Sequence, residues 1–277
     1  QYAHAVMATL GGTLIVTDVD MNTAGASSGA IATDRGSGII TVTGGTVNTS
    51  GANSPGIYST GVITVTDAII TATGSEAAVI EGANSITLNN TNLSSTYADK
   101  WGVMIYQSMS GDAEGTTGSF TMTGGSLAYT SASGPLFYVT NSTGIINLHD
   151  VDVTAASGVL IEAAAGRWGN SSSNGGTVIF TADQQTLSGD MLAVSISSLT
   201  ITLQNGSSLT GAINADQNAQ SASLTLDASS TWVVTADSHL TVLEDTAGIS
   251  GTSISNIIGN GHTVTYDANA NPSLGGK

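Results

Sequence analysis

The sequence predicts an all-β chain that winds into a right-handed parallel β-helix, or β-solenoid, of about ten coils. Short strand segments recur at a spacing of 23 residues, as the segments that open at Ile40, Ile63 and Ile86 illustrate. Their apolar residues alternate with polar ones, which is the period of a strand. Strong helix formers are scarce, 35 of the 277 residues are glycine, and no long stretch has the apolar period of a helix.

Alternation within each segment assigns the inner and outer faces of the coils. In the first of these segments, Ile40 and Val42 are expected to point inward and Thr41 and Thr43 outward, because successive side chains of a strand lie on opposite faces. Stacked coils pair each strand with the strands above and below it, which satisfies the backbone polar groups and buries a continuous apolar column. The right hand is the usual one for parallel crossovers.

The repeat extends over most of the chain, with insertions. A second run of segments opens at Val178, Ile201 and Leu224, again 23 residues apart, and Leu14 opens the series. Insertions of 3, 11, 3 and 9 residues lengthen individual coils. We therefore expect one β-solenoid domain over residues 1–277, with residues 13–243 forming the coils and residues 1–12 forming an N-terminal cap or a preceding coil.

The spacing is lost after Leu243, and residues 244–277 are expected to form a C-terminal cap over the last coil. Within this cap the Asn260-Gly261 pair predicts a tight turn. The N-terminal ten residues lack a basic segment and a cleavage site, so we expect a mature protein or a fragment of a longer one.

Composition narrows the possible partners. Four Lys and Arg stand against 20 Asp and Glu, for a formal net charge of −16. So few cations cannot neutralise a row of phosphates, which argues against nucleic acid as a partner. The absence of cysteine excludes disulfides and zinc-thiolate sites. No apolar run reaches the roughly 18 residues of a membrane-spanning helix, so no membrane insertion is expected in this segment.

A second strand in each coil, about 17 residues after the first, carries the candidate site. Its alternation places isoleucine or phenylalanine inward and aromatic or acidic residues outward, in one column over five coils: Tyr58, Glu81, Tyr106, Tyr138 and Glu162. The two long insertions, residues 107–118 and 163–176, leave from the end of this strand. Three of the four cations flank the same edge, together with two tryptophans: Arg35, Lys100, Trp101, Arg167 and Trp168.

An aromatic, acidic and cationic strip on a rigid sheet predicts a carbohydrate-binding face. Tyrosine and tryptophan rings stack on the apolar faces of sugars, while glutamate and arginine hydrogen-bond hydroxyls or carboxylates. The predicted ligand-binding residues are Tyr58, Glu81, Lys100, Trp101, Tyr106, Tyr138, Glu162, Arg167 and Trp168. The simpler interpretation is that tyrosine suits an exposed strand and that the tryptophans hold the loops in place.

A polysaccharide-degrading enzyme is the main alternative, using the same strip. A glycoside hydrolase needs two carboxylates about 5 to 9.5 Å apart, which would require Asp112 or Glu114 to fold over Glu81 or Glu162. A polysaccharide lyase would instead use Arg167 or Lys100 as the base and Tyr106 or Tyr138 as the acid. No motif specific to either class is present.

Two further interpretations are open. Outward threonine pairs such as Thr41 with Thr43 could form flat ranks of the kind used in ice binding, although Asn89, Asn147 and His149 interrupt them. No cofactor is expected. Two acidic pairs could hold Ca²⁺, although solvated turn residues are the commoner explanation and the glycine-rich Ca²⁺ repeat is absent: Asp18 with Asp20, and Asp150 with Asp152. No histidine pair has metal-ligand spacing.

Repeated strand-turn units such as GSGIITVTGGTVNTSG resemble the right-handed β-helix of secreted bacterial adhesins, over about residues 11–243. Residues 221–243, with the stretch Thr-Trp-Val-Val-Thr-Ala-Asp-Ser that begins at Thr231, look like the terminal coils of pertactin-like autotransporter passenger domains. The resemblance implies an extracellular or cell-surface bacterial protein that contacts a glycan or a host or cell surface. It carries over no catalytic residue.

Overall fold

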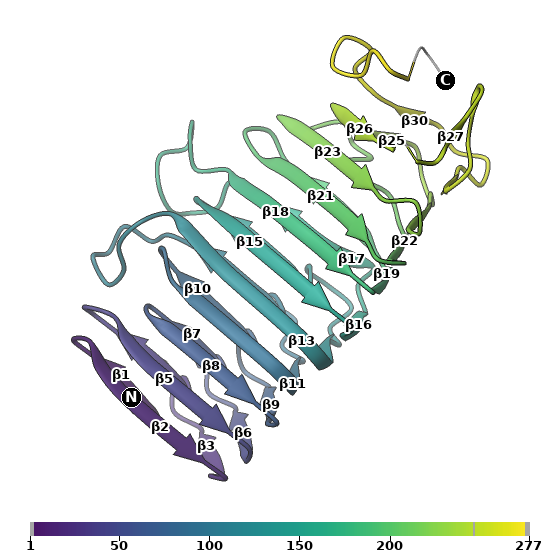
Figure 1. Cartoon of the computed structure of the whole chain (residues 1–277). Helices are drawn as coiled ribbons and strands as arrows, with labels where there is room; N and C mark the ends of the chain where they lie inside the picture. The colour runs from purple at the N-terminus through teal and green to yellow at the C-terminus, as the bar shows by residue number, and fades with distance from the viewer. Residues whose placement is uncertain (1–2, 246, 275–277) are drawn as a thin grey trace.

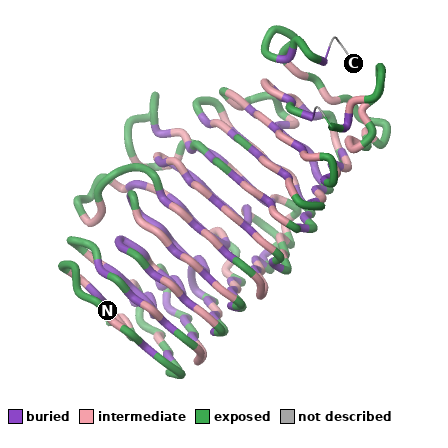
Figure 2. The backbone as a smooth tube through the Cα atoms, viewed as in Figure 1, coloured by how far each residue is buried: buried purple, intermediate pink, exposed green. Residues whose placement is uncertain are grey.

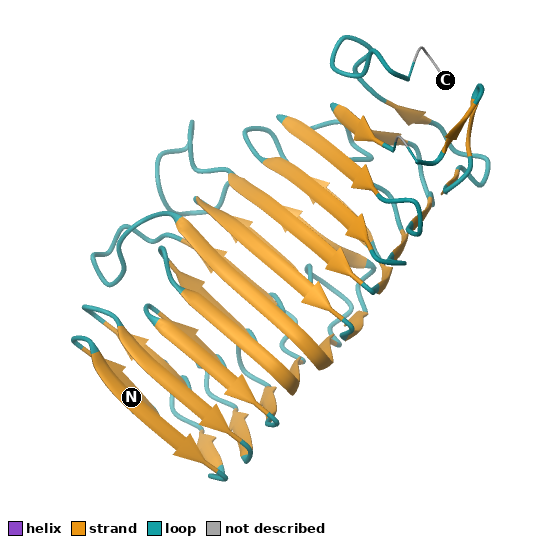
Figure 3. Cartoon of the chain, viewed as in Figure 1, coloured by secondary structure: helices purple, strands orange, loops and turns teal. Residues whose placement is uncertain are grey.

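The computed structural model describes residues 3–245 and 247–274, and these form a parallel β-solenoid of about ten turns (Figure 1). Strands and loops account for the described chain, and none of it is helical (Figure 3). Accordingly, none of the described residues forms a helix long and apolar enough to cross a membrane. The all-β solenoid predicted from the repeat is confirmed.

The largest face is a sheet that we call the long sheet, in which parallel strands follow one another in chain order. The residues at the 23-residue spacing pair directly, as Ile40 does with Ile63. The strands of the long sheet are β2 (Gly12–Thr17), β5 (Gly38–Thr43), β8 (Val62–Thr66), β11 (Ser85–Ser95), β13 (Thr117–Tyr129), β15 (Ser142–His149), β18 (Gly176–Asp183), β21 (Ser198–Gln204), β23 (Ser221–Leu226) and β26 (Val242–Glu244).

A second parallel sheet carries the candidate site and is called the site sheet. Its strands are β1 (Val6–Thr9), β4 (Ile31–Asp34), β7 (Ile57–Ser59), β10 (Ala78–Glu81), β12 (Val103–Tyr106), β14 (Phe137–Thr140), β17 (Val159–Ala163) and β20 (Asp190–Ala193). Both long loops, residues 107–116 and 164–175, leave from the end of this sheet and protrude from one edge of the stack (Figures 1 and 3).

Shorter strands complete the remaining side of the coils. β11 and β13 are long enough to continue onto this side, where they pair with β9 and β16. The strands here are β3 (Met21–Thr23), β6 (Thr46–Thr49), β9 (Ile69–Ala72), β16 (Asp152–Ala155), β19 (Thr186–Ser188), β22 (Ser208–Thr210), β24 (Thr231–Val233) and β29 (Ile257–Ile258).

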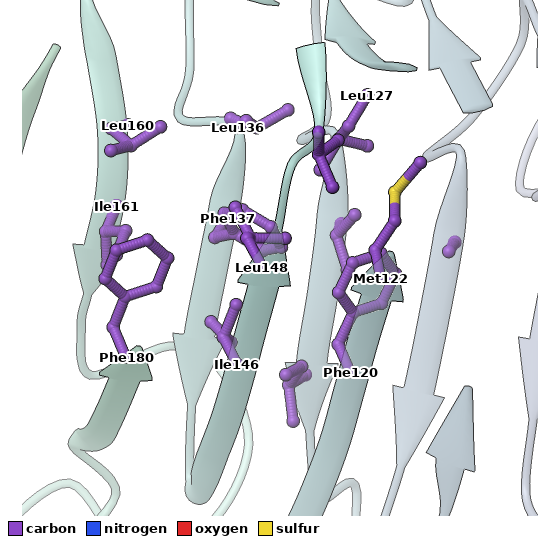
Figure 4. Packing of buried hydrophobic residues seen from close by; sticks show 14 of the residues in the cluster. Phe120, Met122, Leu127, Leu136, Phe137, Ile146, Leu148, Leu160, Ile161 and Phe180 are labelled. Atoms are coloured by element: carbon purple, nitrogen blue, oxygen red, sulfur yellow. The ribbon is translucent and has the colours of Figure 1, made fainter. Parts of the chain in front are cut away.

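The core is the apolar column predicted from the alternation. Burial alternates along most strands of the long sheet (Figure 2), with Ile40, Val42 and Ile63 fully buried between more exposed neighbours. Residues from the long sheet and the site sheet meet across this column: the rings of Phe120 and Phe137 lie 5.5 Å apart, edge to face (Figure 4). Such contacts link the faces of each coil as well as successive coils.

In two coils, double glycines form the corner between the long sheet and the third side, whereas other coils have Asp67-Ala68 or Asn90-Thr91 there. Gly125 has a φ of +74°, and a Cβ atom there would lie 2.2 Å from the carbonyl oxygen of Thr91 in the preceding coil. Gly45 makes the same close approach to Val19. Glycine recurs at this corner because the backbone adopts a left-handed conformation and the coil beneath leaves no room for a side chain.

The last coils continue the parallel pairing beyond residue 243. β29 pairs with β24, and β30 (Val264–Thr265) pairs with β25 (Ser238–His239). The predicted turn at Asn260-Gly261 is present, with positive φ at both residues, and it joins strands that pair with the preceding coil. One antiparallel hairpin, β27 (Ile249–Ser250) with β28 (Ser253–Ile254), interrupts this segment.

Trp232, in the stretch that resembles a passenger terminus, is fully buried, and its Nε1 donates a hydrogen bond to the carbonyl of Gly211 at 2.8 Å. Its role in the described structure is therefore packing of the core in the late coils.

Candidate binding site

The predicted inward and outward faces of the site-sheet strands are correct, but the prediction that the outward residues form a single column is wrong. Ile57, Ile80 and Ile105 are fully buried and point inward, as expected. In register, however, Tyr58 lies opposite Val79, whereas Glu81 lies opposite Tyr106. The outward residues therefore form two ranks: Tyr58, Val79, Met104, Tyr138 and Glu162 in one, and Glu81, Tyr106 and Thr140 in the next.

The cause is a shorter connection between the two sheets in two of the coils, the one that contains Ile63 and the one that runs from Ile146 to Ile161. Ile40 and Ile63 are paired on the long sheet, but their coils reach the site sheet at Ile57 and Ala78, which are also paired. The second coil is thus two residues shorter between the sheets. A slip of two residues changes the neighbour of each side chain and leaves its face unchanged, because the side-chain period of a strand is two.

The strip is covered rather than open. Val79, Met104 and Tyr138 are 3–7% exposed. They pack with four half-buried rings in an apolar cluster separate from the core, formed with Tyr58, Trp101, Tyr106 and Trp168. The prediction of an exposed row of rings is therefore corrected: the segment before β12 and the loop after β17 place tryptophans over the outer face of the sheet.

The rings stack mainly on one another. Trp101 lies parallel to Tyr138 at 4.1 Å between centroids, and Trp168 is tilted against Tyr106 at 4.6 Å. The Arg167 guanidinium carbon lies 4.4 Å from the Trp168 ring centre. These contacts use several of the ring faces that a stacked sugar would need, so a ligand here would meet ring edges and polar groups as well as faces.

Glu81 is the most enclosed of the predicted ligand-binding residues, with 1% exposure. Its Oε2 accepts hydrogen bonds from the hydroxyls of Tyr58 and Tyr106, the latter at 2.8 Å. Its Oε1 accepts from Ser108 and, at 3.5 Å, from Ser110. With Tyr58, Tyr106 and Ser108 as its close donors, this carboxylate links its own coil to both neighbouring coils and to the loop of residues 107–116. The serines were not predicted, because serine is common in every loop of this chain.

A second buried carboxylate was also missed. Glu76 is 3% exposed, and its Oε1 lies 3.3 Å from the Lys100 ammonium, while Ser75 donates to the other oxygen. The available signal in the sequence was an acidic residue directly before an apolar strand in a chain with few charges. Lys100 is held in place because the buried Tyr129 hydroxyl donates to the carbonyls of Tyr97 and Lys100, at 2.8 and 2.7 Å.

Replacing Tyr129 with phenylalanine should lower the free energy of unfolding by about 1 to 2 kcal/mol, because the carbonyls of Tyr97 and Lys100 lose the hydroxyl donor that they share. Hydrogen exchange should also rise in the segment that carries Lys100 and Trp101. Tyr97→Phe is the matched control, since the Tyr97 hydroxyl makes no hydrogen bond within the described residues. Equal effects of the two substitutions would contradict the role given to Tyr129.

A pocket of about 170 Å³ opens beside these groups. The pocket is lined by two of the four cations of the chain, Lys100 and Arg167, and by the buried acid Glu76. Three aromatic residues and five smaller or apolar neighbours complete the lining: Tyr58, Tyr106 and Trp168, with Asn53, Pro55, Ser75, Val79 and Met104. Five predicted ligand-binding residues thus meet at one pocket. The other four do not line it: Trp101 stacks on Tyr138, Glu81 accepts hydrogen bonds from Tyr58 and Tyr106, and Glu162 is paired with Tyr138 in the next coil.

Burial dominates the electrostatics of the tyrosines. It raises the pKa of Tyr58 and Tyr106 well above the ordinary value, and the neighbouring Glu81 carboxylate raises both further. Burial also raises the pKa of Tyr129, Tyr138 and Glu162. The phenols of the site therefore serve as neutral hydrogen-bond donors around neutral pH.

Stability should accordingly fall at alkaline pH. Below a pH of about 10 the tyrosines are protonated in both the folded and unfolded chain, and their contribution is fully present. Above it the unfolded chain ionises while Tyr58 and Tyr106 keep their protons, so each lowers the free energy of unfolding by about 1.4 kcal/mol per pH unit. Denaturant melts between pH 9 and 11 should show a smaller slope for Tyr58→Phe/Tyr106→Phe than for the wild type; an unchanged slope would contradict the assignment.

The proposed catalytic pair is close enough but not accessible. Ser110 contacts Glu81 at 3.5 Å and Asp112 at 3.0 Å, so these carboxylates lie within the roughly 9.5 Å used by glycoside hydrolases. Glu81 is nevertheless enclosed by hydroxyls, and Asp112 forms an ion pair with Arg35 at 3.1 Å. Glu114 is exposed at the loop surface. The enclosure of Glu81 disfavours a direct proton transfer between it and a substrate.

The candidate calcium pairs do not gather into a site. Asp20 accepts hydrogen bonds from the backbone and hydroxyl of Thr46, as a turn residue does. Asp152 is exposed on β16. Asp18 and Asp150 both have positive φ at strand ends. Within residues 3–245 and 247–274, no group of three or more histidine or acidic side chains is placed to hold a metal ion.

The outward face of the long sheet carries a longer threonine rank than the sequence predicted. Eight adjacent strands contribute one residue each, and seven of these are threonine: Thr41, Thr64, Thr87, Thr121, Asn147, Thr181, Thr202 and Thr225. Asn89 and His149 fall in the neighbouring rank.

Comparisons of the chain with protein-family models, with curated proteins and with solved structures found no match. They therefore give no support to the adhesin-like resemblance, while the parallel β-solenoid stands on the structure itself.

Proposed function

We propose that this chain is an adhesin-like binding module, secreted or displayed at a bacterial cell surface, that contacts carbohydrate through the pocket between Trp168 and Lys100. The observation that carries the proposal is the gathering of rare residue types. A chain in which 5% of residues are aromatic and 9% charged brings three aromatic and three charged side chains to one small pocket.

The character of the pocket suits a sugar. Tyr58, Tyr106 and Trp168 supply ring surface, while Asn53, Ser75 and Lys100 supply hydrogen-bonding groups. Its volume of about 170 Å³ is below the roughly 300 Å³ at which drug-sized sites begin, so it fits one unit of a longer glycan. The stacked coils and the Glu81 hydrogen bonds hold the lining residues in place before a ligand arrives, which reduces the entropic cost of binding.

A glycan array tests the proposal, with Trp168→Ala as the variant. Loss of this ring should weaken binding of any captured glycan at least about tenfold, because the pocket loses one wall. Tyr97→Ala is the matched control, since Tyr97 is a half-buried aromatic residue outside the pocket lining. Melting curves establish that both variants are folded. Absence of glycan binding by the wild type, or equal binding by folded Trp168→Ala, would overturn the proposal.

Ice binding by the long sheet is a second candidate function, favoured by the seven threonines in one rank. Coil stacking repeats hydroxyl and methyl groups at about 4.8 Å along a flat surface. A recrystallisation assay would test it: Thr87→Lys should abolish inhibition of ice growth, whereas Thr96→Lys, an exposed position after β11, should not. Ice growth unaffected by the wild type would exclude this function.

A further inference from the structure

The four cations of the chain differ in what they contact. Arg35 pairs with Asp112, and Lys100 pairs with Glu76. Lys277 lies outside the described residues. Arg167 forms no ion pair within residues 3–245 and 247–274, although the chain carries 20 acidic residues. An exposed arginine without a carboxylate is therefore unusual in this protein, and it lines the pocket.

The contact that Arg167 does make orients it for a ligand. Its guanidinium lies 4.4 Å from the Trp168 ring centre. Within the described residues no Arg167 N–H group donates a hydrogen bond to the protein, which leaves these donors available to a ligand. Those N–H groups form the fork that binds a carboxylate through two parallel hydrogen bonds.

The local charge of the pocket is also opposite to that of the chain. The Glu76 charge is compensated by Lys100 at 3.3 Å, which leaves the Arg167 charge uncompensated among the lining residues. With a net charge of −16, the remainder of the protein repels anions, so an anionic ligand would be held by a local contact rather than by the overall field.

We infer that the pocket recognises an acidic sugar, whose carboxylate is bound by Arg167 while its ring lies against Tyr58, Tyr106 and Trp168. This inference rests on the proposed carbohydrate-binding function and narrows it to carboxylated glycans, such as chains ending in or containing uronic or sialic acids. Lys100 contributes further ammonium protons beyond the one directed at Glu76.

A paired array separates this inference from the proposed function. Oligosaccharides containing uronic or sialic acid are printed beside the same oligosaccharides with each carboxyl group reduced to an alcohol. The wild type should prefer the acidic member of a pair at least about tenfold. Arg167→Gln should lose that preference and bind both members equally, because glutamine keeps a polar group but lacks the charge and the fork of N–H donors.

Arg35→Gln is the matched control, since Arg35 lies on the same edge of the solenoid but pairs with Asp112 outside this pocket. It should keep the preference for acidic glycans. Equal binding of acidic and reduced glycans by the wild type would overturn the acidic-sugar inference and leave the carbohydrate-binding proposal standing. A preference that survives in Arg167→Gln would also overturn the role of Arg167. Binding of neither set would overturn the carbohydrate-binding proposal itself.

Discussion

Replacing Glu81 with alanine is expected to lower the local stability of the site sheet by about 3 to 5 kcal/mol. The carboxylate is 1% exposed and accepts hydrogen bonds from Tyr58, Tyr106, Ser108 and Ser110. Without it, these hydroxyls lose a charged acceptor, and the two tyrosine hydroxyls lie in a half-buried environment where water replaces it incompletely. The loop of residues 107–116 also loses its attachment to the sheet.

Hydrogen exchange is the appropriate measurement, because a solenoid can open locally without unfolding as a whole. Amide protection at Ile80 and Tyr106, and throughout the loop, should fall in Glu81→Ala. Glu81→Gln should show an intermediate loss, since an amide keeps the shape but has one acceptor oxygen. Asp112→Asn, which removes an ion pair with a 74% exposed Arg35, should change stability by less than about 1 kcal/mol. Equal protection in Glu81→Ala and the wild type would contradict the structural role of this carboxylate.

Replacing Lys100 with methionine should lower the free energy of unfolding by about 3 kcal/mol, nearly as much as the loss expected for Glu81→Ala. The methionine keeps most of the apolar stem of the lysine but removes the ammonium group. The Glu76 carboxylate, which is 3% exposed, then keeps only the Ser75 hydroxyl as a hydrogen-bond donor within the described residues. An uncompensated buried charge costs more than a missing ion pair at the surface. The partial exposure of Lys100 keeps the expected value at the lower end of the range for buried pairs.

A double-mutant cycle isolates this interaction. Lys100→Met/Glu76→Gln should recover much of the loss caused by Lys100→Met alone, because the double variant buries no unpaired charge. Arg35→Gln is the control for removing a cation at the same edge and should cost less than about 1 kcal/mol. A double variant no more stable than Lys100→Met would show that the loss arises from packing and not from the charge of Glu76.

The candidate site could be predicted only in part. The aromatic and charged residues at the ends of the second strands were identified because such residue types are rare in this chain, and five of them meet at the pocket. Their neighbours were not: the prediction placed Glu81 and Tyr106 level with Tyr58, whereas strand pairing places both of them two residues further along, because the connection between the sheets varies in length from coil to coil. Glu76 was missed because its partner, Lys100, comes from the next coil.

By itself the sequence determined the all-β class, the repeat, the inward and outward faces of each strand and the scarcity of cations. These properties are local or additive: the alternation of side chains follows from the backbone of a single strand, and charge follows from composition. The tertiary structure alone decided which outward residues became neighbours, that loops would cover the strip, and that Arg167 would pair with no carboxylate in the described part of the chain. Those outcomes depend on the register between coils and on the paths of long insertions, which are determined by packing between segments far apart in the chain.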